Sequence, residues 1–216
     1  MPSVKTKPMV RRSQEQRSSE MRERLFRATL DLICEVGFEQ LTTAMIARRA
    51  GVSKGAQTHH FPTKNDLLVG AFIYLTEIWE QSRIAFEAAQ PERIPLEDYI
   101  RYLWRDIFSK PIYLASIELM LAARGDAELR ERIMSVLDHW IEIRDTAFWK
   151  SIDLDMSKQD ASAFMHLTLA VLRGMAINAS FNRDVRENEA VFEAWLAMTR
   201  HLRMGFGLSH PLTLTR

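Results

Sequence analysis

The chain has 216 residues, and 47% of them are hydrophobic, which is enough for a substantial core and excludes disorder along its whole length. Only 8 glycines and 7 prolines are present, so turns are scarce and an all-β sandwich is not expected. Charged or polar residues interrupt every apolar run before it reaches membrane-spanning length, and no apolar segment follows the basic N-terminus. We therefore expect a soluble, cytoplasmic protein with no membrane partner.

The net charge of +1 conceals an asymmetry along the chain. Residues 1–64 carry 12 Lys and Arg against 6 Asp and Glu, a net charge of +6, whereas residues 65–216 carry 17 against 22, a net charge of −5. A basic head is thus joined to an acidic body. The asymmetry predicts a polyanionic partner for the head alone, although charge by itself does not decide whether that partner is nucleic acid.

The pattern of apolar residues, caps and breakers predicts an all-α fold of about nine helices. Residues 1–19 are basic and almost devoid of apolar side chains, and we expect a disordered arm there. Capping boxes are expected at Thr63 with Asp66 and at Ser157 with Asp160, and Asn188 is expected to cap the last helix. The predicted helices cover residues 20–36, 42–50, 53–60, 63–89, 95–108, 111–124, 126–150, 157–179 and 188–205.

The second and third predicted helices are separated only by Gly51, Val52 and Ser53. So short a turn forces a steep crossing, which requires a small residue such as Ala47 at the contact and a permissive backbone at Gly51. The segment therefore has the form of a helix-turn-helix. An ordinary corner between two core helices has the same spacing, so the motif alone leaves DNA binding open.

Few groups in the sequence have the spacing of a reactive site. Cys34 lies in an amphipathic segment, where we expect a small buried hydrophobic side chain and not a nucleophile. The adjacent His59 and His60 point about 100° apart on a helix, so a metal site is not expected. No hydrolase, zinc-protease, phosphate-loop or dinucleotide motif occurs, and neither a cofactor nor an enzyme activity is predicted.

Four motifs together resemble the TetR family of bacterial transcriptional regulators. They are Gly37-Phe38, the segment from Leu41 to Ala47, the segment from Ala50 to Gly55, and the segment from His59 to Leu68. The detailed resemblance covers about residues 20–70. It implies a helix-turn-helix DNA-binding domain at 20–66 and a helical ligand-binding and dimerisation domain at 67–216.

The resemblance also implies which residues meet DNA. The recognition helix would make base and phosphate contacts, and its flanking caps would bind the phosphate backbone. Two positions depart from the family pattern, which usually has an apolar residue followed by tyrosine where this chain has Gln57 and Thr58. Gln57 falls on the expected inward face, so it either finds a hydrogen-bond partner or loosens the helix. The expected DNA-binding residues are Thr42, Thr43, Lys54, Ala56, Gln57, Thr58, His59, His60 and Lys64.

The acidic body contains many aromatic and methionine side chains on predicted helices. Such residues suit a cavity for an apolar or aromatic ligand, because methionine and tryptophan adapt to irregular shapes, although plain core packing uses the same residues. Arg173 stands on an otherwise apolar helix, where it would either meet a ligand carboxylate or serve a surface role. The candidate ligand-binding residues are Trp104, Phe108, Met120, Trp140, Phe164, Met165, Arg173 and Met175.

The last two predicted helices carry apolar rows that either pack within the chain or pair with a second copy. In the family that the chain resembles, these helices form a four-helix interface between two subunits, and Gly174 would allow close approach there. The candidate interface residues are Leu167, Ala170, Gly174, Ile177, Trp195, Met198 and Leu202.

The sequence thus favours a dimeric regulator that binds an inverted repeat in double-stranded DNA, most simply a repressor released by a small apolar or aromatic effector. The helix predicted at 63–89 is the element that runs from the head into the body, so we expect it to couple the two functions. The alternative is an all-α small-molecule binding protein that has lost DNA binding through the changes at Gln57 and Thr58.

Overall fold

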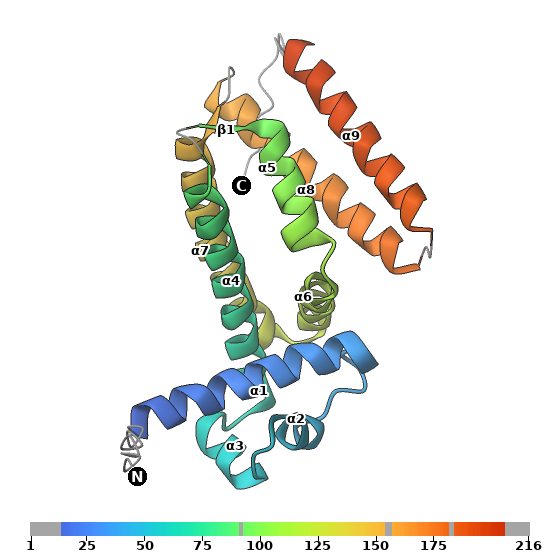
Figure 1. The fold of residues 1–216 in the computed structure, drawn as a ribbon. Helices are drawn as coiled ribbons and strands as arrows, with labels where there is room; N and C mark the ends of the chain where they lie inside the picture. Colours follow the sequence, from blue (N-terminus) through green and yellow to red (C-terminus); the bar gives the residue numbers. More distant parts are fainter. Residues whose placement is uncertain (1–13, 91–92, 154–156, 182–183, 206–216) are drawn as a thin grey trace, which may run out of the picture. The chain divides into compact units, whose positions relative to one another are not determined.

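The computed structural model describes residues 14–90, 93–153, 157–181 and 184–205 (Figure 1). The chain divides into two compact units, with the boundary between Ala71 and Phe72 inside α4. We refer to them as the N-terminal unit and the C-terminal unit. Nine α-helices lie in the described part: α1 (Gln14–Val36), α2 (Thr43–Ala50), α3 (Lys54–His60), α4 (Lys64–Ala88), α5 (Leu96–Tyr102), α6 (Pro111–Ala122), α7 (Ala127–Ser151), α8 (Lys158–Phe181) and α9 (Val185–Gly205). The all-α prediction is confirmed.

Side-chain caps define the short helices of the N-terminal unit. The Thr42 hydroxyl accepts a hydrogen bond from the Met45 amide at 3.2 Å, and the Ser53 hydroxyl accepts one from the Ala56 amide at 3.1 Å. Gly51 ends α2 in the left-handed conformation with φ of 64°, which a side chain would resist. Gly51 and Ser53 fix the tight turn that the sequence predicted, and Thr42 fixes the start of the helix before it.

The first helix begins earlier than expected. Residues 14–19, which were assigned to the disordered arm, belong to α1, and residues 1–13 lie outside the described part. The extension is exposed, and it continues a helix whose buried face begins only at Leu25. Propagating an existing helix needs one hydrogen bond per residue and no new nucleus, so a polar segment without an apolar face can continue it.

The N-terminal unit packs closely around Gly70. A Cβ atom at Gly70 would lie 2.5 Å from Cε1 of Phe26, whose ring lies 5.2 Å from that of Phe61. Thr63 and Asp66 form the predicted capping box at the start of α4: the Thr63 amide donates to the Asp66 carboxylate, and the Asp66 amide donates to the Thr63 hydroxyl, both at 3.0 Å. The cap fixes where α4 begins, and Gly70 allows it to approach α1.

The C-terminal unit departs from the predicted helices in its middle. The expected helix at 95–108 is α5 followed by a π-helix, η1 (Leu103–Phe108), and α6 is followed by a short 3-10 turn, η2 (Ala123–Gly125). A two-residue parallel strand pair was also missed, in which β1 (Ile94–Pro95) pairs with β2 (Ile152–Asp153). Two residues are too few for a strand pattern to be recognised in a sequence.

Helices α8 and α9 lie side by side (Figure 1). Ion pairs join α9 to α5. The Arg200 Nε donates to Glu97 at 2.8 Å, and Arg101 Nη1 lies 2.5 Å from Glu193. Ser157 and Asp160 cap α8 as predicted. The prediction that Asn188 caps α9 is wrong: α9 begins at Val185, and the Asp184 carboxylate accepts from the Arg186 amide at 2.9 Å.

The segment Gln159–Phe181, which forms most of α8, is long and apolar enough by composition to cross a membrane. Core helices of water-soluble proteins pass the same test, and 39% of its most apolar window is buried within the chain. The feature is therefore weak support for a membrane span.

Candidate functional site

The outer surface of α3 is rich in exposed polar side chains. Lys54, Thr58 and His59 are exposed, and the Thr58 hydroxyl donates to the Lys54 carbonyl at 3.0 Å. Ala56 and His60 are half-buried, and the His59 and His60 rings meet edge to face at 5.4 Å. Of these side chains, Lys54 carries the positive charge, and it makes no ion pair within the described residues.

Gln57 turns to the inside of the N-terminal unit, as its position on α3 predicted. It is 3% exposed, and its side-chain oxygen Oε1 has no hydrogen-bond partner within the described part of the chain. A buried carbonyl without a partner forfeits its hydrogen bond to water. The sequence left open whether Gln57 finds a hydrogen-bond partner or loosens the helix. For its side-chain oxygen, the structure favours the second alternative, a weaker packing of α3.

Several basic side chains of this unit serve its own structure. Arg24 donates from Nε to the Ala50 carbonyl at 2.9 Å and from Nη2 to the Gly51 carbonyl at 2.8 Å, so α1 binds the end of α2. Lys64 donates to the Leu41 carbonyl at 2.9 Å and lies over the Phe38 ring. Arg49 forms a bidentate ion pair with Glu35. Sequence reasoning had placed Lys64 at the phosphate backbone and had not considered Arg24.

The expected positions at the start of α2 are accessible to different degrees. Thr42 is exposed while its hydroxyl serves as the cap, and Thr43 is half-buried in the first turn. Cys34 is exposed, so the prediction of a buried cysteine is wrong. On α1, Cys34 follows the buried Leu32 and Ile33 but falls on the outward side of the helix. Among the described residues, no group of three or more His, Cys, Asp or Glu side chains is placed to hold a metal ion.

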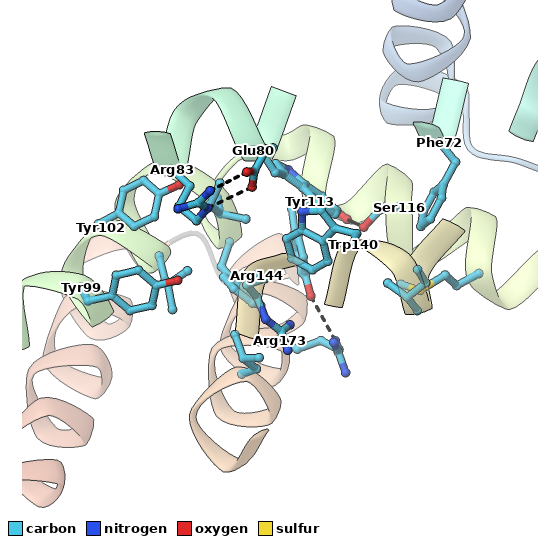
Figure 2. A pocket seen from close by; sticks show the side chains of 17 residues that line it. Phe72, Glu80, Arg83, Tyr99, Tyr102, Tyr113, Ser116, Trp140, Arg144 and Arg173 are labelled. Atoms are coloured by element: carbon cyan, nitrogen blue, oxygen red, sulfur yellow. Dashed lines mark hydrogen bonds and ion pairs between the residues drawn. The ribbon is translucent and has the colours of Figure 1, made fainter. Parts of the chain in front are cut away.

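The C-terminal unit encloses a cavity lined by residues of α4, α5, η1, α6, α7 and α8 (Figure 2). Its empty space, including the opening to solvent, is about 670 Å³, of which about 50 Å³ admits the centre of a water molecule. The interior is therefore narrow. Aromatic rings dominate its wall: Trp79 lies 5.2 Å from Trp140 and 5.9 Å from Tyr113, and Phe108 lies 4.4 Å from Tyr113.

Charged groups occupy two places in this wall. On α4, Arg83 Nε donates to Glu80 at 2.9 Å, and Arg83 Nη1 lies 2.5 Å from Glu87. Elsewhere in the wall, Arg173 Nε donates to the Tyr113 hydroxyl at 3.0 Å, and the Arg144 guanidinium lies over the Trp140 ring. The hydrogen bond that Arg83 donates to Glu80 raises the pKa of Arg83 above its usual value, against the effect of burial.

The structure gathers half of the predicted ligand-binding residues in this cavity. Phe108, Met120, Trp140 and Arg173 line it. Trp104 and Met175 instead line a separate depression beside α9, and Phe164 and Met165 are buried outside both. Sequence reasoning missed the residues from α4 and the tyrosines, although the spacing of Glu80, Arg83 and Glu87 on one helix face signalled the ion pairs.

Comparison with known proteins now identifies the chain. The family model described as bacterial regulatory proteins of the tetR family matches residues 25–71, which hold the helix-turn-helix. The HTH-type transcriptional regulator CymR of Pseudomonas putida is 32% identical over 196 residues, covering 88% of this chain and 94% of the relative. The chain belongs to the TetR family of transcriptional regulators.

Solved structures of other proteins share the fold. A transcriptional regulator from Saccharomonospora viridis, solved in complex with choline, superposes with a TM-score of 0.66 at 14% identity and covers 85% of this chain and 97% of its own. The multidrug binding protein EbrR, solved with imidazole, gives a TM-score of 0.58 at 23% identity and covers 82% and 93%. At these identities the likeness establishes the fold alone.

This TetR-family chain exposes an apolar row along α8. Leu167, Ala170, Gly174 and Ile177 are all exposed, and a Cβ atom at Gly174 would meet nothing within 4 Å. On α9, Met198 is exposed, whereas Trp195 is buried against its own chain and so departs from the predicted row. The side chain of Leu202 lies outside the described residues.

Proposed function

We propose that this TetR-family regulator is a dimeric repressor that leaves its operator when a small apolar or aromatic effector binds the cavity of the C-terminal unit. The observation that carries the proposal is the exposed face of a capped recognition helix, α3, in a chain that also holds an aromatic-walled cavity. Membership in a family of DNA-binding regulators supports the first half. The complexes of two proteins of similar fold with choline and with imidazole support the binding of a small molecule.

The proposed DNA contacts fall into two groups. Lys54 and the capped N-termini at Thr42 and Thr43 would bind phosphates, and Thr58, His59 and His60 would face the bases of the major groove. Lys64 would have to share its ammonium group between phosphate and the Leu41 carbonyl, which three donors permit. Ala56 and Gln57 would support the helix from within.

The proposed dimer uses the exposed row of α8 together with Met198 of α9. A monomer would leave five large apolar side chains of α8 and α9 exposed to water: Leu167, Ile177, Phe181, Val191 and Met198. Pairing α8 and α9 with their copies would bury this row and set two recognition helices on an inverted repeat. Such a protein acts on chromosomal DNA, and we propose the cytoplasm as its location.

The proposed link between effector and operator is α4. Four residues of α4, Phe72, Trp79, Glu80 and Arg83, line the cavity, and the same helix begins in the N-terminal unit. A ligand that shifts α4 would thereby alter the spacing of the two recognition helices. Typical couplings of about 1–3 kcal/mol would lower operator affinity by roughly 5- to 150-fold.

DNA binding can be tested by fluorescence anisotropy with the inverted repeat nearest the gene. The wild type should bind, and affinity should fall steeply with salt, because phosphate contacts release counterions. Lys54→Ala should flatten the salt slope, whereas His59→Ala should change the preferred base. Arg130→Ala, an exposed position on α7, is the matched control. Equal affinity of the wild type and a Lys54, His59, His60 triple-alanine variant would reject the proposal and favour a small-molecule carrier.

The dimer can be tested by sedimentation. Because a Cβ atom at Gly174 meets nothing within its own chain, Gly174→Leu should leave the monomer fold intact and weaken only the association. Gly125→Leu, which is likewise open, serves as the control. A wild-type monomer at micromolar concentration would contradict the proposed interface.

A further inference from the structure

The cavity of the C-terminal unit is electrically polarised. Near one end, Arg83 is shared by two carboxylates, Glu80 and Glu87, which leaves this cluster with a net charge of −1. The two carboxylates more than balance the single positive charge of Arg83, so no ligand is needed to neutralise it. This end of the cavity therefore does not call for an anion: both carboxylates face Arg83, and the buried Oε1 atom of Glu87 has no hydrogen-bond partner within the described residues.

A second set of charged side chains, Arg144, Asp145 and Arg173, has an excess of positive charge. Arg144 is 6% exposed, and its Nε donates to Asp145 at 2.9 Å, so its charge is matched. Arg173 donates to the neutral Tyr113 hydroxyl and has no carboxylate partner within the described part of the chain (Figure 2). Together Arg144, Asp145 and Arg173 carry a net charge of +1.

Tyr113, Arg144 and Arg173 line the same cavity. Arg173 Nε donates to the Tyr113 hydroxyl at 3.0 Å, so one guanidinium and one hydroxyl lie together in the wall. Burial raises the pKa of the Tyr113 phenol, while the charges of Arg173 and, more weakly, of Arg144 lower it. This part of the wall therefore offers an anion two guanidinium groups, one of them already paired with Asp145, and one hydroxyl.

The neighbouring wall is built for a flat ring. Trp79, Phe108, Tyr113 and Trp140 contact one another with ring centroids 4.4–5.9 Å apart. The accessible space beside this aromatic wall is narrow, so a planar aromatic group fits it better than a bulky aliphatic one. The ring wall and the excess positive charge share Tyr113 as a common member.

We propose that the effector of this regulator is an aromatic monocarboxylate, with its ring against the wall formed by Trp79, Trp140 and Phe108 and its carboxylate bound by Arg173, Arg144 and the Tyr113 hydroxyl. The inference rests on the proposed ligand-responsive function and names its ligand class. A guanidinium donates a fork of N–H groups that matches the two oxygens of a carboxylate. One negative charge balances the excess, and the carboxylates at Glu80 and Glu87 would repel a second.

The test is isothermal titration of the full-length protein with three ligands that share one ring system: 2-naphthoate, 2-naphthamide and 2-naphthylmethylamine. The anion should bind at least about tenfold more tightly than the neutral amide, because hydrogen bonds to charged groups are the stronger ones. The cation should bind most weakly. Equal binding of anion and amide, tighter binding of the cation, or no binding of any of the three at millimolar concentration would overturn the proposal.

Substitutions locate the carboxylate. Arg173→Gln should weaken 2-naphthoate binding by roughly 10- to 100-fold and leave 2-naphthamide within about threefold, whereas Arg173→Lys should recover part of the loss. Tyr113→Phe should weaken the anion by a smaller factor. Arg130→Gln removes an equal charge from exposed α7 and should change neither ligand. Thermal melts of each unliganded variant establish that it folds, and an equal loss of both ligands in Arg173→Gln would contradict the assignment.

The two proposals fail in distinguishable ways. DNA affinity is measured without ligand, so its absence rejects the regulator proposal whatever the cavity binds. Binding of 2-naphthoate that depends on Arg173 but leaves operator affinity unchanged would support the ligand class and reject the coupling.

Discussion

In the N-terminal unit, arginines complete the structure, whereas in the C-terminal unit one arginine faces a cavity without a carboxylate partner. Arg24 binds two carbonyls at the end of α2, and Arg49 is paired with Glu35. Arg173 donates instead to a tyrosine hydroxyl beside an aromatic wall. The contrast teaches that a positive charge in a sequence does not identify its role: the Arg24 side chain serves folding, and the Arg173 side chain is available to a ligand.

The space around glycine residues also differs between the two units. Around Gly70 the N-terminal unit has no room for a methyl group, while Gly125 in the C-terminal unit is open. A unit that must hold a recognition helix in one geometry benefits from contacts that allow no alternative. A unit that encloses a cavity keeps space among its helices. Four predictions test this comparison.

The largest expected effect is that of Gly70→Ala. The new methyl group would overlap the Phe26 ring, and the strain should lower the free energy of unfolding by about 1–3 kcal/mol in urea denaturation. Gly125→Ala, where a Cβ atom meets nothing within 4 Å, is the control and should not destabilise the protein. Equal stability of the two variants would show that the N-terminal unit accommodates the methyl group and would break the contrast in packing.

The second prediction compares the two arginines directly. Arg24→Gln removes hydrogen bonds to the Ala50 and Gly51 carbonyls and should lower the free energy of unfolding by about 1 kcal/mol. Arg173→Gln removes one bond to a phenol from an exposed side chain, and the unliganded protein should keep its melting temperature. A larger loss in Arg173→Gln than in Arg24→Gln would assign Arg173 to the structure and not to a ligand.

The same contrast explains what the sequence could predict. The caps at Thr42, Ser53 and Thr63 were recognised because each involves a donor and an acceptor within three residues of one another. The cavity was half recognised, because its lining is assembled from six elements that are distant along the chain. The π-helix η1 was missed, since it differs from an α-helix only in the register of its hydrogen bonds.

The third prediction concerns two of the buried polar atoms without partners, one chosen from each unit. Gln57 Oε1 and Thr168 Oγ1 are both buried and unpaired within the described residues. Gln57→Leu and Thr168→Val should each raise the free energy of unfolding by about 1 kcal/mol, because an apolar group needs no hydrogen bond there. Chemical denaturation measures both. A destabilising effect of Gln57→Leu would contradict this prediction. It would mean that the Gln57 amide stabilises α3, and that glutamine in place of the family's usual apolar residue serves the structure.

The smallest expected effect concerns the acid stability of two exposed ion-pair groups, one in each unit. Hydrogen bonds from Arg200 and Arg101 hold the pKa of Glu97 below the usual 4.5, against the effect of burial, and a hydrogen bond from Arg49 lowers the pKa of Glu35. A carboxyl group whose pKa is lower in the folded state stabilises the protein above its unfolded pKa. That contribution is lost as the pH falls below 4.5 through the folded value.

Because Glu97 joins α5 to α9 through two arginines, Glu97→Gln should flatten the pH dependence of the melting temperature below pH 4.5 more than Glu35→Gln, whose partner is one arginine. The Glu97 side chain is 30% exposed, so solvent screening limits its effect to a few tenths of a kcal/mol. Melting curves at pH 3.5 and pH 6 measure it. A larger change for Glu35→Gln would mean that the helix-turn-helix, and not the attachment of α9, is the acid-sensitive part of the molecule.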